Sequence, residues 1–282
     1  MKRLLIALGR LVSGLGLVAS LLSAAPPASA ETPQQRDACH GKGSATPEMR
    51  IAGCTAFITS GGHDDADIAE AFNLRGAAHG DREEWDNALS DYTTAVQLVP
   101  TVAILVYNRG LAYLHKQDFD HAIADFDQAI KFDPSLASAY NNRGIAYRNK
   151  GDYAAAIVNY DQAIKLNPAS VSSFNNRGTA YYRKREFDAA IADFDEAIRL
   201  NPKYVQAWNN RALAYFDKQD YARSIASFDA SLKLDPDIPL ALYGRGLARQ
   251  NSSDRKGGDA DIAAAKALDP DVVKDFAAVI AK

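Results

Sequence analysis

Large apolar and small residues return along the chain at a fixed spacing of 34 residues, without insertion or deletion, between residues 69 and 272. Within each 34-residue unit, positions 4, 8 and 11 share one helical face, as do positions 20, 24 and 27. Each unit therefore predicts two helices joined by a short turn. Such units bury their apolar faces against their neighbours, which indicates a quasi-one-dimensional stack. We expect six units, 69–102, 103–136, 137–170, 171–204, 205–238 and 239–272.

The residue types in the unit explain how its two helices meet. Position 4 is large and apolar, position 8 is glycine except for Ala212, and positions 20 and 27 are nearly always alanine or serine. Small residues allow helices to approach at about 8 Å, and large residues at positions 11 and 24 fill the space beside them. Acidic residues at the turn favour the start of the second helix: Asp118, Asp152, Glu186 and Asp220. A proline at position 32 ends it: Pro100, Pro134, Pro168, Pro202, Pro236 and Pro270.

This pattern closely resembles the tetratricopeptide repeat family at positions 4, 8, 11, 20, 24, 27 and 32. The resemblance implies an all-α fold, a right-handed superhelical solenoid of antiparallel helix pairs with a concave inner surface. It implies binding of a protein or peptide and does not imply a reaction. Position 7 departs from the family, which often has leucine there, because every unit of this chain has arginine: Arg75, Arg109, Arg143, Arg177, Arg211 and Arg245.

The recurring arginine is interpreted as a structural residue rather than as a binding site. Position 23, on the second helix, holds an acidic residue near enough for an ion pair within the unit in four cases: Asp91, Asp125, Asp193 and Asp261. Asn159 and Ser227 interrupt this series in units three and five. If such a pair is buried, loss of one partner destabilises far more than loss of an exposed pair.

Residues 31–68 are expected to form an N-terminal cap. A helix that begins at Thr46-Pro47 and ends at Gly61-Gly62 resembles the second helix of a preceding repeat. Cys39 and Cys54 are the only cysteines, and they predict one disulfide that ties an extended N-terminal strand across this helix. A reduced pair, or a partial metal site with His40 and His63, is the alternative, although the spacing fits no zinc pattern.

The opposite end and the first thirty residues also depart from the repeat. Residues 273–282 are expected to form a C-terminal capping helix whose apolar residues recur at helical spacing. Residues 1–30 have the features of a signal peptide, with Lys2 and Arg3, an apolar stretch and Ala28-Ser29-Ala30 at the cleavage site. An uncleaved membrane anchor is the alternative. Cleavage implies a periplasmic or secreted bacterial protein with no membrane insertion afterwards.

Candidate binding residues lie on the first helix of each unit. The resemblance places position 6 on the concave surface, and there the four central units carry Asn108, Asn142, Asn176 and Asn210. An asparagine amide both donates and accepts, so this asparagine ladder can pair with an extended peptide backbone. The alternative is that asparagine is simply common at this position in the family and that the ladder is hydrated surface without a binding role.

A second group of candidates follows the ladder along the same helices: Arg148, Tyr182, Arg183 and Phe216. An aromatic platform beside positive charge suits an acidic or C-terminal carboxylate group. A solvated charged face explains these residues as well.

Other function classes find no support in the sequence. The net charge is −3 with no basic run, which argues against nucleic-acid binding. No nucleophile motif, phosphate loop or metal-ligand spacing is present, so we expect neither catalysis nor a cofactor or metal. The sequence therefore predicts an exported adaptor or scaffold that binds proteins or peptides through its concave surface. A structural or oligomerisation module and a regulatory subunit of a cell-envelope enzyme are the alternatives.

Overall fold

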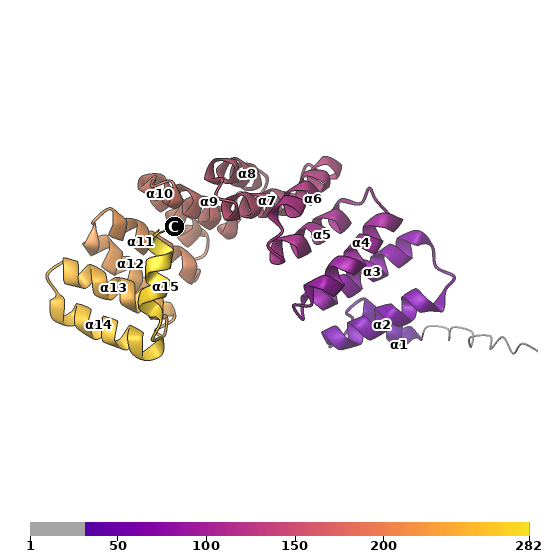
Figure 1. Cartoon of the computed structure of the whole chain (residues 1–282), viewed down its shortest axis with the longest axis horizontal. Helices are drawn as coiled ribbons and strands as arrows, with labels where there is room; N and C mark the ends of the chain where they lie inside the picture. Colours follow the sequence, from indigo (N-terminus) through magenta and orange to yellow (C-terminus); the bar gives the residue numbers. More distant parts are fainter. Residues whose placement is uncertain (1–31, 282) are drawn as a thin grey trace, which may run out of the picture.

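The computed structural model describes residues 32–281, which form helices α1–α15 with no strand among them (Figure 1). The predicted signal peptide lies outside the described residues. Two helices precede the repeats, α1 (Pro33–Cys39) and α2 (Pro47–Ser60). Six helix pairs follow: α3 (Asp65–Gly80) with α4 (Trp85–Leu98), α5 (Ala103–His115) with α6 (Phe119–Phe132), α7 (Ala137–Asn149) with α8 (Tyr153–Leu166), α9 (Val171–Arg183) with α10 (Phe187–Leu200), α11 (Val205–Asp217) with α12 (Tyr221–Leu234), and α13 (Pro239–Asn251) with α14 (Arg255–Leu268). The last helix is α15 (Val272–Ala281). The expected all-α solenoid of helix pairs is confirmed.

The turn between the two helices of a unit has a repeated construction. Aspartates at the start of the second helix accept a hydrogen bond from a backbone N–H one turn ahead, as a helix N-cap does: Asp118, Asp152, Asp220 and Asp254. Glu186 occupies the same place but makes no such bond. The predicted capping role therefore holds for the aspartates alone.

Glycine at position 8 lets the aromatic ring at position 24 lie directly against the first helix. In unit three, a Cβ added to Gly144 would lie 2.6 Å from the ring of Tyr160, which is closer than real Cβ contacts come. Gly110 with Phe126 and Gly178 with Phe194 repeat this contact. The rings are fully buried, so each unit has its own small core between its two helices.

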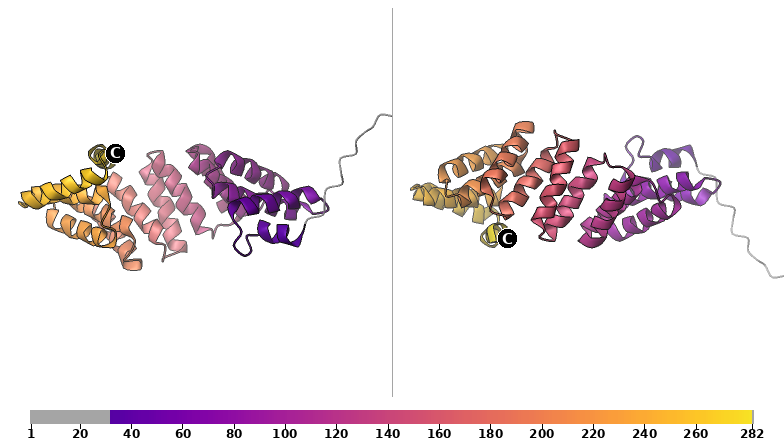
Figure 2. Two further views of the ribbon diagram at one scale, coloured as in Figure 1. Left: turned by 90° about the horizontal axis from the view of Figure 1, so that it is seen from below. Right: turned by 90° about the horizontal axis from the view of Figure 1, so that it is seen from above.

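The helix pairs stack side by side into an arch, and the helices run across its long axis (Figures 1 and 2). Successive first helices, such as α7, α9 and α11, contact one another across unit boundaries. Successive second helices do so less, because they lie on the outer side of the arch. The first helices therefore line the concave surface.

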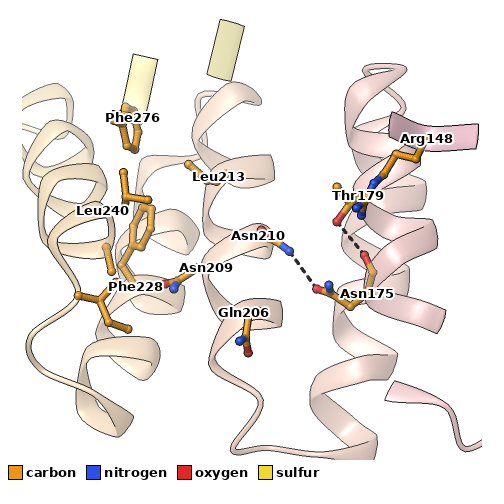
Figure 3. Close-up of a pocket in the computed structure, with 12 residues that line it drawn as sticks. Arg148, Asn175, Thr179, Gln206, Asn209, Asn210, Leu213, Phe228, Leu240 and Phe276 are labelled. Carbon is orange, nitrogen blue, oxygen red and sulfur yellow. Dashed lines mark hydrogen bonds between the residues drawn. The ribbon is translucent and has the colours of Figure 1, made fainter. Parts of the chain in front are cut away.

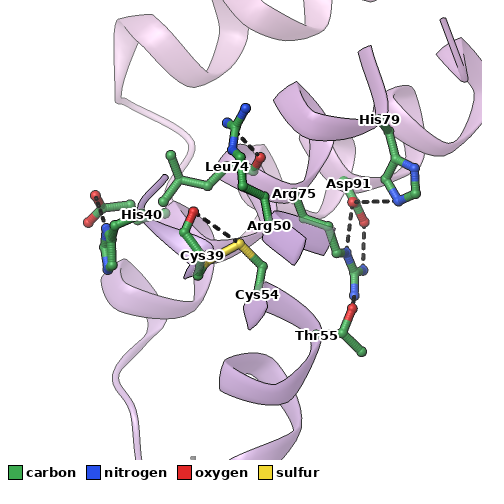
Figure 4. Close-up of a disulfide and its surroundings, with 10 residues drawn as sticks. Cys39, His40, Arg50, Cys54, Thr55, Leu74, Arg75, His79 and Asp91 are labelled. Carbon is green, nitrogen blue, oxygen red and sulfur yellow. Dashed lines mark hydrogen bonds and ion pairs between the residues drawn. A yellow bond between two sulfur atoms is a disulfide. The ribbon is translucent and has the colours of Figure 1, made fainter. Parts of the chain in front are cut away.

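At the N-terminal end, α1 and α2 form a short helical hairpin that packs on α3. Cys39 at the end of α1 and Cys54 in α2 form a disulfide and are both fully buried (Figure 4). The two helices approach so closely that a Cβ on Gly53 would lie 2.4 Å from the carbonyl oxygen of Gln35. The predicted disulfide is present, which excludes the reduced pair and a metal site that uses these sulfurs.

The segment before Cys39 corrects one expectation. It is helical and not an extended strand, because Thr32 and Gln35 form a capping box that starts α1. The helix α2 begins after Thr46 and ends at Gly61, as the sequence predicts, and it packs on α3 as a second helix packs on the next unit.

At the C-terminal end, α15 leaves the repeat pattern and packs mainly on α13, a first helix, rather than on α14. Val272 and Phe276 are buried, whereas Val273 stays exposed. The Phe276 ring contacts the Tyr243 ring of α13 and the Phe216 ring of α11, at centroid distances of 5.2 and 6.4 Å. The last helix therefore reaches the first helices of the last two units.

The disulfide should stabilise the N-terminal hairpin, because α1 is too short to fold alone. A cross-link over 15 residues contributes about 3 kcal/mol in the chain-entropy model. We expect reduction to lower the melting temperature and to speed tryptic cleavage at Arg36 and Lys42. A Cys39→Ala/Cys54→Ala variant should show both effects without reductant and no further change with it. Unchanged melting and cleavage after reduction would contradict a structural role.

Candidate functional site

Four of the six position-7 arginines form ion pairs with a buried aspartate of their own unit. In unit four, Arg177 Nε and Nη2 donate to the two carboxylate oxygens of Asp193 at 2.8 and 2.6 Å. The Asp193 side chain is only 7% exposed. The same two-bond geometry joins Arg75 to Asp91, Arg109 to Asp125 and Arg245 to Asp261. The predicted position-23 pairs are confirmed in all four units that carry the aspartate.

Each arginine in units three to six also reaches the preceding unit, a contact that the sequence reasoning missed. Arg177 Nη1 donates to Asp161 of α8 at 2.6 Å, and Arg245 Nη1 donates to Asp229 of α12 at 2.7 Å. The acceptor is always the aspartate at position 25: Asp127, Asp161, Asp195 and Asp229. At the N-terminal end, Thr55 of α2 accepts from Arg75 at 3.0 Å (Figure 4).

The pKa values of Arg177 and Asp193 are shifted by burial and by the bonds between the two groups. The bonds to Asp193 and Asp161 raise the pKa of Arg177 above its ordinary value. Burial raises the pKa of Asp193, and the hydrogen bonds and charge of Arg177 oppose that rise. The arginine is therefore what allows a charged carboxylate to stay inside the stack.

The asparagine ladder links the first helices of successive units. Asn176 Nδ2 donates to Asn141 Oδ1 of the preceding unit at 3.2 Å. The other three members donate in the same direction to the residue at position 5 of the unit before: Asn108 to Asn73, Asn142 to Tyr107 and Asn210 to Asn175. All four are partly exposed. One N–H of each amide is therefore engaged inside the protein, and that bond fixes the direction of the amide.

The second group of candidates divides into basic and buried aromatic residues. Arg148 and Arg183 line a groove of about 720 Å³ together with Thr179 and with residues at the turns that follow α5 and α7. Tyr182 does not form the expected open platform, because it is 8% exposed and its hydroxyl donates to Asp217 at 2.6 Å. Burial and this bond raise its pKa.

Phe216 is also engaged within the protein, because its ring packs against Phe276 of α15 and Tyr221 of α12. The structure thus brings Arg148 and Arg183 together in one groove. It uses both aromatic candidates largely for packing.

The repeats are recognised by sequence as well as by geometry. Two tetratricopeptide repeat models match the chain, one over residues 110–151 and 146–185 and the other over residues 175–239 and 209–269. The chain belongs to the tetratricopeptide repeat family. No curated protein matches this tetratricopeptide repeat protein at a significant level.

Solved structures share the fold at low identity. PilF of Pseudomonas aeruginosa is 17% identical over 76% of this chain and 98% of its own, with a TM-score of 0.66. YrrB, described as a TPR protein with an unusual peptide-binding site, is 21% identical over 65% and 96%, with a TM-score of 0.54. The MamA protein is 23% identical over 61% and 94%, with a TM-score of 0.55. At these identities the likeness shows the fold alone.

Removing a position-7 arginine should have a cost that depends on its position-23 partner. Arg177→Ala leaves the buried Asp193 carboxylate without a counter-charge, and we expect a loss of about 3–5 kcal/mol. Arg143→Ala leaves only the neutral Asn159, whose Nδ2 still donates to a backbone carbonyl, and we expect about 1–2 kcal/mol.

These two variants are closely matched, because both arginines also bind a position-25 aspartate and lie over a position-4 aromatic ring. Urea unfolding followed by circular dichroism measures the difference. Equal losses for Arg177→Ala and Arg143→Ala would contradict the role given to Asp193.

Proposed function

We propose that this protein is an exported adaptor or scaffold that binds a protein or peptide along its concave surface and catalyses no reaction itself. The observation that carries the proposal is the asparagine ladder, which repeats polar amides at the pitch of the units along one side of the arch. Repeat proteins offer an extended surface of this kind to their partners.

The inter-unit bonds support binding rather than compete with it. Each ladder asparagine uses one N–H for its neighbour, and the amide keeps a second N–H; the carbonyl oxygen of Asn176 also accepts a bond from Arg148 at 3.4 Å. Because the first bond holds the amide in a fixed direction, little side-chain entropy is lost when a partner binds. An extended chain that crosses successive first helices along the arch would meet these groups at regular intervals, with Arg148 and Arg183 beside them to attract an acidic group.

Export of the protein is supported by the features of residues 1–30 and by the disulfide. A buried disulfide is stable in an oxidising compartment and rare in the reducing cytosol. Within residues 32–281, no helix is long and apolar enough to cross a membrane. The features of residues 1–30 and the disulfide together support a location in the periplasm or outside the cell, with the segment before Glu31 removed.

The ladder is tested by an Asn142→Ala/Asn176→Ala variant. Peptides are selected on the purified wild-type protein from a displayed random heptapeptide library, labelled with fluorescein, and titrated by fluorescence anisotropy. Loss of two ordered amides should weaken binding about ten-fold or more.

The matched control is Tyr107→Phe/Asn141→Ala, which removes the acceptors of the same two inter-unit bonds and keeps both ladder asparagines. The control should bind far better than the ladder variant. Equal binding by wild type and the ladder variant would contradict the role of the ladder, and failure to select any peptide would count against concave-surface binding.

The export proposal predicts the N-terminus of the natural protein. Mass spectrometry of the protein recovered from cells should find a chain that begins at Glu31, with a mass that rises by two hydrogens on reduction. A chain that retains residues 1–30 and fractionates with membranes would favour the anchor instead, and alkylatable thiols in the native protein would argue against an oxidising location.

A further inference from the structure

Unit five lacks the glycine that contacts the position-24 aromatic ring in units one to four. Its position 8 is Ala212, which carries a methyl group there. The ring of Phe228 lies against the next unit, where a Cβ added to Gly244 would come within 2.5 Å of it. Gly244 stands at position 6 of unit six, the position of the ladder asparagine. The Phe228 ring and an asparagine side chain at position 244 cannot both occupy this space.

Because residue 244 is glycine, one hydrogen-bond acceptor in unit five has no donor in unit six. Asn73, Asn141 and Asn175 at position 5 each accept a hydrogen bond from the asparagine at position 6 of the following unit. Asn209 is the equivalent residue of unit five, and Gly244 has no side chain to donate to it. Its Oδ1 is buried and has no hydrogen-bond partner among the described residues. An unpaired buried acceptor costs stability unless something fills it.

A cavity of about 350 Å³ opens beside Asn209 on the concave side (Figure 3). Leu213 of α11, Phe228 of α12, Leu240 of α13 and Phe276 of α15 form an apolar end. Thr179 of α9 and Arg148 of α7 lie at the opposite, polar end. Within the described part of the chain, Arg148 is the only charged residue that lines this cavity, and its contact with Asn176 Oδ1 is long, at 3.4 Å.

We propose that this cavity binds an extended segment of a partner protein that carries a large apolar side chain and, toward α7, an acidic residue. The apolar side chain enters between Leu213, Leu240 and Phe276, and the acidic group pairs with Arg148. A backbone N–H of the segment donates to Asn209, whose amide turns about its terminal torsion to meet it. The inference rests on the proposed function and assigns one specificity pocket within that concave surface.

The chemistry of the walls selects this occupant. Burial of a large apolar side chain removes water from both surfaces, and the cavity volume lies within the range of ligand pockets. A segment whose residue at this point is small or charged would leave the apolar end unfilled or bury a charge without a partner. A basic segment would be repelled by Arg148. The ladder supplies binding along the backbone, and the cavity adds the preference for particular side chains.

The test uses two pocket variants and one matched control. Ala212→Gly/Gly244→Asn restores the pattern of the other units, so that Phe228 can return to its own unit and the asparagine introduced in α13 can donate to Asn209. Leu240→Gln makes the apolar wall polar. Ile104→Gln is the control. Ile104 occupies position 2 of unit two, as Leu240 does in unit six, but it is exposed and does not line the cavity. Melting curves should show that the restored variant is at least as stable as wild type.

The probes are fluorescein-labelled heptapeptides selected on wild type from a displayed random library, together with versions in which the large apolar residue is changed to alanine or the acidic residue to its amide. We expect the selected peptides to combine Leu, Ile, Phe or Met with Asp or Glu. Both pocket variants should weaken their binding at least about ten-fold, and Ile104→Gln should leave it unchanged. Arg148→Gln should remove the preference for the acidic peptide over its amide version.

Three outcomes overturn parts of the argument separately. Peptides that bind wild type and both pocket variants equally would overturn the pocket and leave concave-surface binding intact. Selected peptides without a shared apolar residue would do the same. A library that yields no binding peptide would count against the proposed function as well as against the pocket.

Discussion

The stack depends on the arginine at position 7. Arg177 donates to the position-23 aspartate of its own second helix, to the position-25 aspartate of the preceding second helix, and lies over the Phe174 ring of its own first helix. One side chain therefore joins three helices from two units. Leucine, which the family often has at this position, could fill the same space by packing, but it could not fix the direction of its neighbours. The guanidinium group has a planar array of donors, and this geometry specifies how one unit is placed on the next.

On the concave surface, too, single side chains join neighbouring units. The ladder asparagines hold successive first helices together by side-chain hydrogen bonds and remain partly exposed. The arginine and the asparagine are consecutive residues, about 100° apart around each first helix, so two separate sets of contacts fix each unit to its neighbour. A surface whose polar groups are held in this way is ordered before a partner arrives, and binding to it loses less conformational entropy.

The C-terminal part of the arch shows how two small sequence changes act together. Unit five has Ala212 in place of the glycine, the Phe228 ring contacts Gly244, and the ladder ends at Asn210 because Gly244 cannot continue it. Each substitution looks like simple decay of the repeat when the sequence is considered alone. In the structure they are one rearrangement, which leaves Asn209 without its donor beside a cavity that α15 helps to enclose.

The sequence by itself determined the helix pairs, the glycine–aromatic contacts within units and the arginine–aspartate pairs at position 23. These features are local, because they depend on spacing within one helix or within one 34-residue unit. The tertiary structure decided the contacts between units, which include the position-25 aspartates, the bond from each ladder asparagine to the residue 35 positions earlier, the burial of Tyr182 and the ring contacts of Phe216. It also decided that α15 turns onto α13 instead of extending the stack. The period of the sequence states what each unit contains, but the direction of a side chain between two units depends on how the units are stacked.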